Sequence, residues 1–264
     1  MRGIAPSPAT RWVIAVVVGL FFAVPLLSTL LFTLTTRDGA FTADRWLGLF
    51  DPASAGLYAP IWVGVTNSLI LSVVTVVIVL FILAPTMVLV ALRFPKLRRP
   101  FEFVALLPIT IPAIVLVVGL APVYLQIGRT LGTGAWTLAF AYGILVLPFA
   151  YRSIQASIDA VDLTTLSEAA RTLGASWPSV LLHVIAPNLR QGLLAASLIS
   201  VAVVLGEFTI ASLLNRQVFQ TGILLVSRID AYASAVFTLI ALAFAFLLLL
   251  IIGRAARAGG RRSS

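Results

Sequence analysis

The sequence contains no cysteine and only one histidine, His183, among its 264 residues. These absences exclude a disulfide framework and a thiolate metal site, and a single imidazole cannot form a metal site by itself. The strings HExxH, GxSxG and GxxxxGK followed by Ser or Thr do not occur either. We therefore expect no metal, no cofactor and no nucleotide-hydrolysing or proteolytic chemistry in this chain.

Charged residues are also scarce, at 10% of the sequence, whereas soluble globular proteins contain about 25%. Hydrophobic residues make up 61%, and the mean hydropathy is +1.11. This balance is that of an integral membrane protein. Six segments are apolar and long enough to cross a bilayer as helices, namely residues 12–34, 61–92, 104–124, 134–151, 192–214 and 233–252. The predicted fold is therefore all-α, with six transmembrane helices.

The 18 lysine and arginine residues are distributed unevenly between the two sides that six spans define. Most lie on the side of the two termini, and the opposite side has Arg37, Arg45, Arg129, Arg216 and Arg228. Since basic residues in short loops mark the cytoplasmic face, both termini are predicted to be cytoplasmic. The net charge of +9 then reflects topology and attraction to anionic membrane lipid, and it gives little support to nucleic-acid binding.

The spans also indicate how the chain is organised. We expect a first transmembrane helix and an external loop in residues 1–60, a core domain in residues 61–253 and a basic cytoplasmic tail in residues 254–264. The external loop, near residues 35–60, contains Trp46 and Phe50, which are expected at the membrane interface. A cytoplasmic loop lies near residues 152–191. Both loops are too short to form a soluble domain.

The cytoplasmic loop contains the stretch SEAARTLGASWPSVLLHVIAP, residues 167–187. Thr165 and Glu168 form a capping-box pattern, so a helix is predicted to begin at Thr165. Gly174 stands where a left-handed residue would end that helix. Ser176 can cap a second helix, and Pro187 is expected to end it. The sequence therefore predicts two short helices, joined at a glycine, within residues 164–187.

Both predicted helices carry apolar residues at helical spacing, which are Leu166, Ala169, Ala170 and Leu173 in the first and Trp177, Val180, Leu181 and Val184 in the second. One interpretation is a hairpin that floats among the lipid headgroups. Such a hairpin usually has a face rich in lysine and arginine, whereas this one has only Arg171 opposite Glu168. Its composition therefore favours docking against protein.

This segment resembles the EAA signature of the permease subunits of bacterial ABC importers, which runs Glu-Ala-Ala, three residues, Gly, nine residues and Ile-x-Leu-Pro. Five residues match at the right spacing: Glu168, Ala169, Ala170, Gly174 and Pro187. Two positions differ from the signature, since Val184 replaces its isoleucine and Ala186 its leucine, but each replacement is also apolar. The stretches TNSLILSVVTVVIVL, ALRFPKLRRPFEFVALLPITIPAIVL and LGEFTIASLL are similar to further parts of the family, so that the resemblance covers roughly residues 64–252.

The resemblance implies a type I, or MetI-like, permease fold and ATP-driven import through a bacterial inner membrane. Residues 165–187 would be coupling helices that sit in a groove of a cytoplasmic ATPase, which is present in two copies. A second permease subunit would complete the pathway, in a heterodimer rather than a homodimer. An extracytoplasmic binding protein would deliver the cargo and dock at the external connection that contains Asn215, Arg216, Asp230 and Tyr232.

Among the groups of this family, the chain most resembles the spermidine and putrescine permeases and their iron, thiamine and phosphonate relatives. The six-span length and the strings RFPKLRRP, LLPITIPAIVL and GEFTIASLL carry this likeness. The cargo implied is a polyamine-like or related small solute.

Glu207 lies about halfway along the fifth predicted span. An ionisable residue at that depth is costly unless a partner or a wet cavity receives it. The Glu207 carboxyl group could be satisfied by neighbouring backbone or hydroxyl groups, or be protonated, and have only a packing role. It could instead line the translocation pathway, near a gate or a transient substrate site. Both interpretations stay open. The prolines at positions 85, 108, 112 and 148 are expected to kink their spans for packing rather than to act as hinges.

The alternative from another functional class is a secondary transporter or a channel that acts without an ATPase. Such proteins usually place ionisable residues and broken helices in paired repeats at the membrane midplane, whereas this sequence has one carboxylate there. A membrane-embedded enzyme is disfavoured because no nucleophile and base, and no metal set, can be assembled from the spans. A purely structural subunit would not need a capped double helix.

Overall fold

A computed structural model describes residues 7–36 and 38–260. Within these residues the secondary structure is helical, apart from an isolated antiparallel bridge between Thr35 and Phe41. The all-α prediction is therefore confirmed. Arg37 and the end of the predicted basic tail, residues 261–264, lie outside the described residues.

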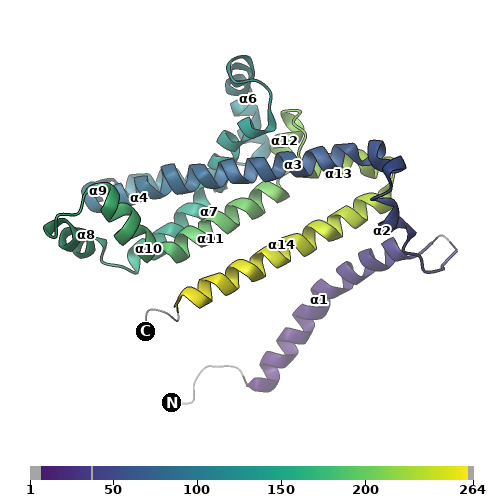
Figure 1. The fold of residues 1–264 in the computed structure, drawn as a ribbon, viewed down its shortest axis with the longest axis horizontal. Helices are drawn as coiled ribbons and strands as arrows, with labels where there is room; N and C mark the ends of the chain where they lie inside the picture. Colours follow the sequence, from purple (N-terminus) through teal and green to yellow (C-terminus); the bar gives the residue numbers. More distant parts are fainter. Residues whose placement is uncertain (1–6, 37, 261–264) are drawn as a thin grey trace. The chain divides into compact units, whose positions relative to one another are not determined.

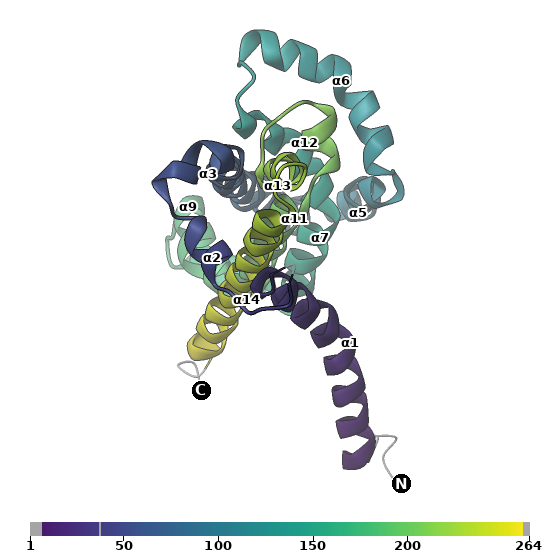
Figure 2. The same cartoon turned by 90° about the vertical axis from the view of Figure 1, so that its right-hand side faces the viewer.

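The helices are labelled in Figure 1, apart from α5, which is labelled in Figure 2. Their bounds are α1 Pro8–Leu34, α2 Asp44–Gly48, α3 Ala55–Ile78, α4 Ala84–Arg93, α5 Arg98–Leu106, α6 Ala113–Thr130, α7 Ala139–Asp159, α8 Leu163–Thr172, α9 Trp177–Ser179, α10 Ala186–Asn188, α11 Arg190–Gly206, α12 Thr209–Leu213, α13 Phe219–Ser227 and α14 Ala231–Gly260. Short 3-10 turns are formed by Pro52–Ser54, Pro95–Leu97, Leu107–Thr110 and Ala135–Leu138.

Several of these helices are long and apolar enough to cross a membrane. Four stretches qualify, namely Ala9–Leu34, Pro52–Arg93, Ala113–Thr130 and Ala135–Asp159. A fifth is formed if Trp177–Asn188 and Arg190–Gly206, which meet at 79°, make one bent span. The apolar part of α14, Ala231–Leu247, is shorter. The protein is thus multi-pass, while six complete spans and cytoplasmic termini stay predictions.

Two of the predicted spans are interrupted: span 104–124 near the prolines where a kink was expected, and span 192–214 where no interruption was predicted. Within predicted span 104–124, regular helix gives way to a 3-10 turn that ends at Thr110, and α6 begins at Ala113. Ile111 is extended, with φ −100° and ψ 120°, because a residue before proline avoids the helical conformation. Predicted span 192–214 breaks after Gly206, where Glu207 has φ −80° and ψ 127°.

Two other prolines lie inside continuous helical runs. Pro85 and Pro187 each follow a π-helical turn, formed by Val79–Leu83 and Val180–Ile185. Proline lacks an N–H, and in a regular α-helix its ring collides with the carbonyl oxygen one turn earlier. A turn widened by one residue gives the ring room, so the helix continues through the proline. Pro148, where a kink was expected, lies inside the continuous helix α7 with no widened turn before it, and Pro25, Pro60 and Pro122 likewise lie inside α-helices. A proline in these helices can therefore interrupt the helix, follow a widened turn or lie within a regular α-helix.

The chain forms two compact units, which are described separately. Unit 1 consists of Met1–Ala59 and Ile223–Phe244, and unit 2 of Pro60–Gly222 and Ala245–Ser264. In unit 1, the Tyr232 ring stacks on Phe32 with 4.5 Å between centroids, and the Arg45 guanidinium lies 3.3 Å from the Tyr232 centroid. Arg45 also donates to the carbonyl oxygen of Phe32 at 2.9 Å, in the last turn of α1, where a cation is favourable.

In unit 2, α7 and α11 pack against each other and form the centre of the core. Gly192 of α11 makes this approach possible, because an added Cβ would lie 2.5 Å from Ser157 Oγ and 2.6 Å from the Ser153 carbonyl oxygen. α6 packs beside α12 in the same unit, as Figure 2 shows. The α7–α11 pair is therefore the rigid element to which the functional segments are attached.

Candidate functional site

The predicted cytoplasmic segment is a helical hairpin, defined here as residues 162–189. Its first helix, α8, begins at Leu163 rather than at Thr165. Asp162 caps the helix, since its carboxylate accepts the Thr165 hydroxyl at 2.7 Å and the Thr165 N–H at 3.1 Å. These hydrogen bonds lower the pKa of Asp162, and the Thr165 hydroxyl contributes more to this than the Thr165 N–H. The predicted capping box at Thr165 and Glu168 was wrong, because a carboxylate already stood at the earlier position.

Gly174 ends α8 in the predicted left-handed conformation, with φ +86°. The Gly174 N–H donates to Arg171 O at 3.0 Å, and the Ala175 N–H donates to Ala170 O at 3.1 Å, which is the pattern of a Schellman motif. The Arg171 guanidinium donates to Ala175 O at 3.0 Å and lies 5.6 Å from the centroid of the Trp177 ring. These contacts fix the turn between the two helices of the hairpin.

The second helix of the hairpin begins after Ser176, as predicted, although the Ser176 side chain makes no capping hydrogen bond. It runs over Trp177–Asn188 through α9, the π-helical turn and α10. The prediction that Pro187 ends this helix was wrong, since the widened turn before Pro187 accommodates its ring. The helix ends at Asn188, one residue after Pro187, and at Leu189 the chain bends by 79° into α11.

One face of the hairpin is buried in the core of unit 2. Its aliphatic side chains there are Leu163, Val180, Ile185 and Leu189, which pack in one cluster with Met87 and Val88 of α4, Ala150 and Ile154 of α7 and Ala196 of α11. Burying such a side chain contributes about 1.5–3 kcal/mol. The hairpin is therefore attached to three helices of unit 2.

The opposite face of the hairpin is exposed and partly apolar. Leu173 is 89% exposed, Leu182 64% and Trp177 47%. The signature residues Glu168, Ala169, Gly174 and Pro187 are exposed as well, and Ala170 is half-buried. The apolar face predicted for the first helix was thus partly wrong, because Ala169 and Leu173 point away from the core while Leu163 and Ser167 point into it. Figure 1 shows α8 and α9 together at one end of unit 2.

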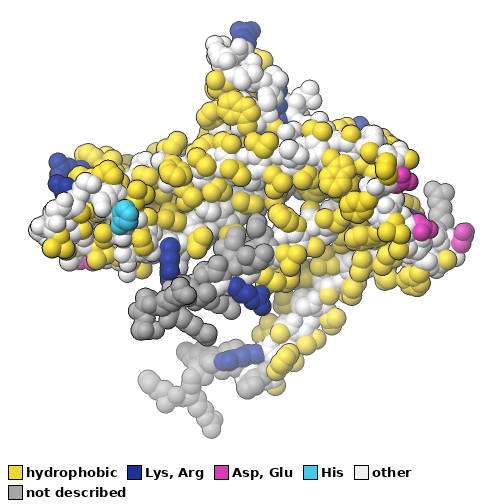
Figure 3. All heavy atoms as spheres, in the orientation of Figure 1, with side chains coloured by type: hydrophobic (Ala, Val, Ile, Leu, Met, Phe, Trp, Pro, Cys, Tyr) yellow, Lys and Arg dark blue, Asp and Glu magenta, His cyan; other side chains and the backbone are white. Residues whose placement is uncertain are grey.

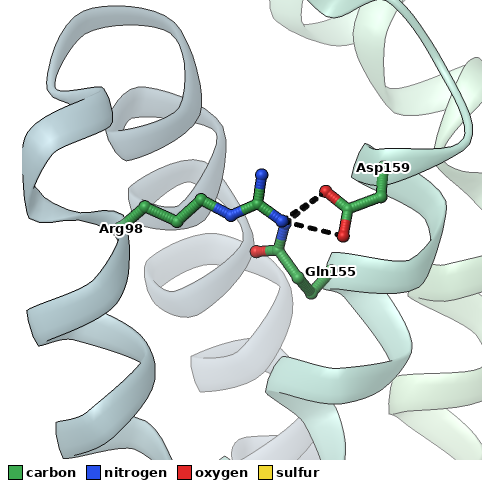
Figure 4. A network of polar contacts seen from close by, with 3 residues as sticks. All are labelled: Arg98, Gln155 and Asp159. Carbon is green, nitrogen blue, oxygen red and sulfur yellow. Dashed lines mark hydrogen bonds and ion pairs between the residues drawn. The ribbon is translucent and has the colours of Figure 1, made fainter.

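A polar network fixes the position at which the hairpin starts (Figure 4). Arg98 Nη2, at the beginning of α5, lies 2.7 Å and 2.9 Å from the two carboxylate oxygens of Asp159, at the end of α7. Gln155 donates to the same carboxylate at 2.9 Å. Both ionic side chains are about half-exposed, so the pair contributes only about 0–1 kcal/mol. Its role is therefore one of orientation, and no pattern in the sequence pointed to it.

Glu207 is buried at the break between α11 and α12. Its carboxylate accepts the Tyr142 hydroxyl at 2.8 Å, the Ile210 N–H at 2.9 Å and, at a longer 3.4 Å, the Ala211 N–H. The two amides belong to the first turn of α12, where N–H groups have no partner within the helix. In the described part of the chain, no three His, Asp or Glu side chains gather as metal ligands would. The hydrogen bonds of Glu207 therefore stabilise the break between α11 and α12.

Comparison with known proteins identifies the family. Residues 88–258 match the model of the binding-protein-dependent transport system inner membrane component, and this stretch contains both the 162–189 hairpin and Glu207. The spermidine/putrescine transport system permease protein PotB of Haemophilus influenzae is 29% identical over 217 residues, which are 74% of this chain and 73% of that protein. The resemblance that the sequence predicted is confirmed. The chain belongs to the family of binding-protein-dependent transport system inner membrane components, and is an ABC-type transport permease related to a polyamine permease.

Proposed function

We propose that this chain is one of two permease subunits of an ATP-driven importer in a bacterial inner membrane, and that the 162–189 hairpin is its contact with a cytoplasmic ATPase. The observation that carries the proposal is the two-sided construction of the hairpin. Aliphatic side chains are buried on the core, while Leu173 and Trp177 are exposed on the other side. Clustered apolar side chains on an outer face mark a surface that another protein covers.

The hairpin is suited to move as one piece with the membrane helices. The Schellman turn at Gly174 and the Arg171 contacts hold its two helices together, and a bend at Leu189 connects it directly to α11. Displacement of the outer face by an ATPase would be passed to α7 and α11, because no flexible loop intervenes. We therefore assign ATPase coupling to the five signature residues, which are Glu168, Ala169, Ala170, Gly174 and Pro187.

We assign the break at Glu207 to the wall of the translocation pathway. Gly206 and Phe208, on either side of it, are exposed. Backbone groups that a broken helix releases within a membrane need a protein partner or a water-filled cavity. The Glu207 carboxyl group accepts the Ile210 N–H, one of the released backbone groups, and the Tyr142 hydroxyl donates to the same carboxyl group. In this arrangement Glu207 shapes the wall, and a second permease subunit would form the facing wall.

The remaining parts of the proposal concern partners, cargo and orientation. The complex would contain a second permease, in a heterodimer, two copies of a cytoplasmic ABC ATPase and an extracytoplasmic binding protein. The name of the relative from Haemophilus influenzae supports a polyamine-like or related small solute as cargo. The excess of basic residues on the side of the termini supports cytoplasmic termini, which puts the hairpin on the ATPase side. We retain the division into residues 1–60, 61–253 and 254–264.

Reconstitution tests the proposal. The chain, its partner permease, the ATPase and the binding protein are placed in liposomes, and uptake of labelled polyamine is measured. We expect uptake to require ATP and the binding protein, and to stop when an ATPase variant that cannot hydrolyse ATP replaces the normal subunit. Uptake that continues without any ATPase would overturn the proposal in favour of a secondary transporter or channel.

A further inference from the structure

The connection between α4 and α5 is a compact elbow, defined here as residues 93–103. The 3-10 turn Pro95–Leu97 connects the two helices, and its Leu97 N–H donates to Phe94 O at 2.8 Å. Three cations of the elbow are exposed: Arg93, Lys96 and Arg99. Three large apolar side chains are exposed among them, with Phe103 at 70%, Leu97 at 51% and Phe94 at 48%. The elbow therefore presents positive charge and apolar surface together.

The charge of the elbow is largely free of internal partners. Arg98 is engaged with Asp159, and this is the one ion pair in residues 7–36 and 38–260. Glu102 is the one acidic residue of the elbow, and it forms no ion pair with Arg98 or Arg99. The Arg98–Asp159 pair also joins the elbow to the end of α7 (Figure 4). The elbow is thus anchored to α7, and three of its cations have no ion-pair partner among the described residues: Arg93, Lys96 and Arg99.

The combination of residues in the elbow distinguishes it from the 162–189 hairpin. On the hairpin, the cation Arg171 is engaged with the Ala175 carbonyl oxygen, and the exposed face is mainly apolar, which suits a protein groove. On the elbow, three free cations alternate with aromatic and aliphatic side chains, which suits the boundary of an anionic membrane. Figure 3 shows Lys and Arg side chains beside hydrophobic ones at the end of unit 2 that carries α4 and α9.

We propose that the elbow binds the headgroups of anionic phospholipids in the cytoplasmic leaflet, with Arg93, Lys96 and Arg99 on the phosphates and Phe94, Leu97 and Phe103 among the acyl chains. This inference rests on the orientation given under the proposed function, in which α4 ends at the cytoplasmic face. A cation near an anionic membrane surface contributes about 1 kcal/mol, so each one changes lipid affinity by about fivefold. The effect is specific to the headgroup charge and weakens with salt.

Lipid binding is measured on the purified full-length chain in detergent, by native mass spectrometry during titration with phosphatidylglycerol or with phosphatidylcholine of the same acyl chains. The test variant is Lys96→Gln with Arg99→Gln. The matched control is Arg129→Gln with Arg228→Gln, which removes the same charge from exposed positions outside the elbow. We expect the chain to prefer phosphatidylglycerol. The elbow variant should lose about thirtyfold in phosphatidylglycerol affinity, and the control variant should retain it.

Three results would overturn the inference: no preference for phosphatidylglycerol, equal losses in both double variants, or unchanged affinity in the elbow variant. If the elbow variant keeps its lipid preference but no longer binds the ATPase in a separate pull-down, the inference is overturned and the elbow is a protein contact. Thermal unfolding in detergent establishes that both variants are folded. Because lipid binding is measured without the ATPase and the binding protein, its failure is distinguishable from a failure of ATP-driven uptake.

Discussion

Gly174 gives the most direct test of the turn in the 162–189 hairpin. At its φ of +86°, a residue with a Cβ costs about 1–2 kcal/mol more than glycine, and a β-branched residue costs still more. No heavy atom lies within 4 Å of an added Cβ, so the cost arises from the backbone alone. A difference of this size changes the ratio of native to altered turns by a factor of about 5–30. We expect the loss of uptake to increase in the order Gly174→Asn, Gly174→Ala, Gly174→Val, because asparagine adopts this conformation most readily.

The assay is ATP-dependent uptake by the reconstituted complex, with substrate-stimulated ATPase activity measured in parallel. Membrane insertion of each variant should equal that of the wild type. Gly132 provides a matched control, since it has φ +85°, open space around an added Cβ and a position outside the hairpin. Gly132→Ala should leave coupling intact. Normal uptake by Gly174→Val, or equal losses in the two alanine variants, would refute the reasoning.

Three further predictions follow from single positions. Glu207→Gln removes one of the two carboxyl oxygens that accept hydrogen bonds from Tyr142 and Ile210. It should lower the unfolding free energy of the purified chain in detergent by about 1–2 kcal/mol, and unchanged stability would contradict its role at the break. If uptake and ATPase stimulation are then unaltered, only a packing role remains. Gly192→Ala brings a Cβ to 2.6 Å from the Ser153 carbonyl oxygen and should lower the free energy of unfolding by about 1–3 kcal/mol. Gly206→Ala is the control, since no heavy atom lies within 4 Å of its added Cβ, and it should lower stability less. Equal effects of the two substitutions would show that the close approach of α7 and α11 does not matter. The lowered pKa of Asp162 means that its cap stabilises α8 above the ordinary aspartate pKa and is lost as the pH falls through the lowered value. The rate of amide hydrogen exchange in the first turn of α8, corrected for its intrinsic pH dependence, should therefore rise in acid. In Asp162→Ala this rate should already be high at neutral pH. Protection in that variant equal to that of the wild type would exclude the cap.

Local signals in the sequence were sufficient for much of the hairpin. The left-handed Gly174 and the start of the second helix after Ser176 were predicted correctly, because turn chemistry depends on a few adjacent residues. The start of α8 was predicted two residues late, since Asp162 and Thr165 are both acceptable caps and only the folded chain shows which is used. Likewise, spacing alone did not reveal that Leu173 points away from the core.

Features that depend on distant contacts were not predictable in this way. Arg98 and Asp159 are 61 residues apart, and only the packing of α5 against α7 brings them together. The effect of each proline had the same limitation. Pro112 follows an extended residue at which the helix is interrupted, whereas Pro85 follows a widened turn and Pro148 lies within a continuous α-helix. The break at Glu207 was also missed, since its stabilising donor, the Tyr142 hydroxyl, comes from another helix.

The central claim, that the outer face of the hairpin contacts an ATPase, is most directly tested by site-specific cross-linking. The chain has no cysteine, so Leu173→Cys introduces a single reactive thiol at a position that is 89% exposed. Leu131→Cys, at an exposed position outside the hairpin, is the control. In the assembled complex with a short thiol-to-amine cross-linker, we predict a product between the permease and the ATPase for Leu173→Cys and none for Leu131→Cys. The absence of that product with Leu173→Cys in a complex that transports normally would contradict the account.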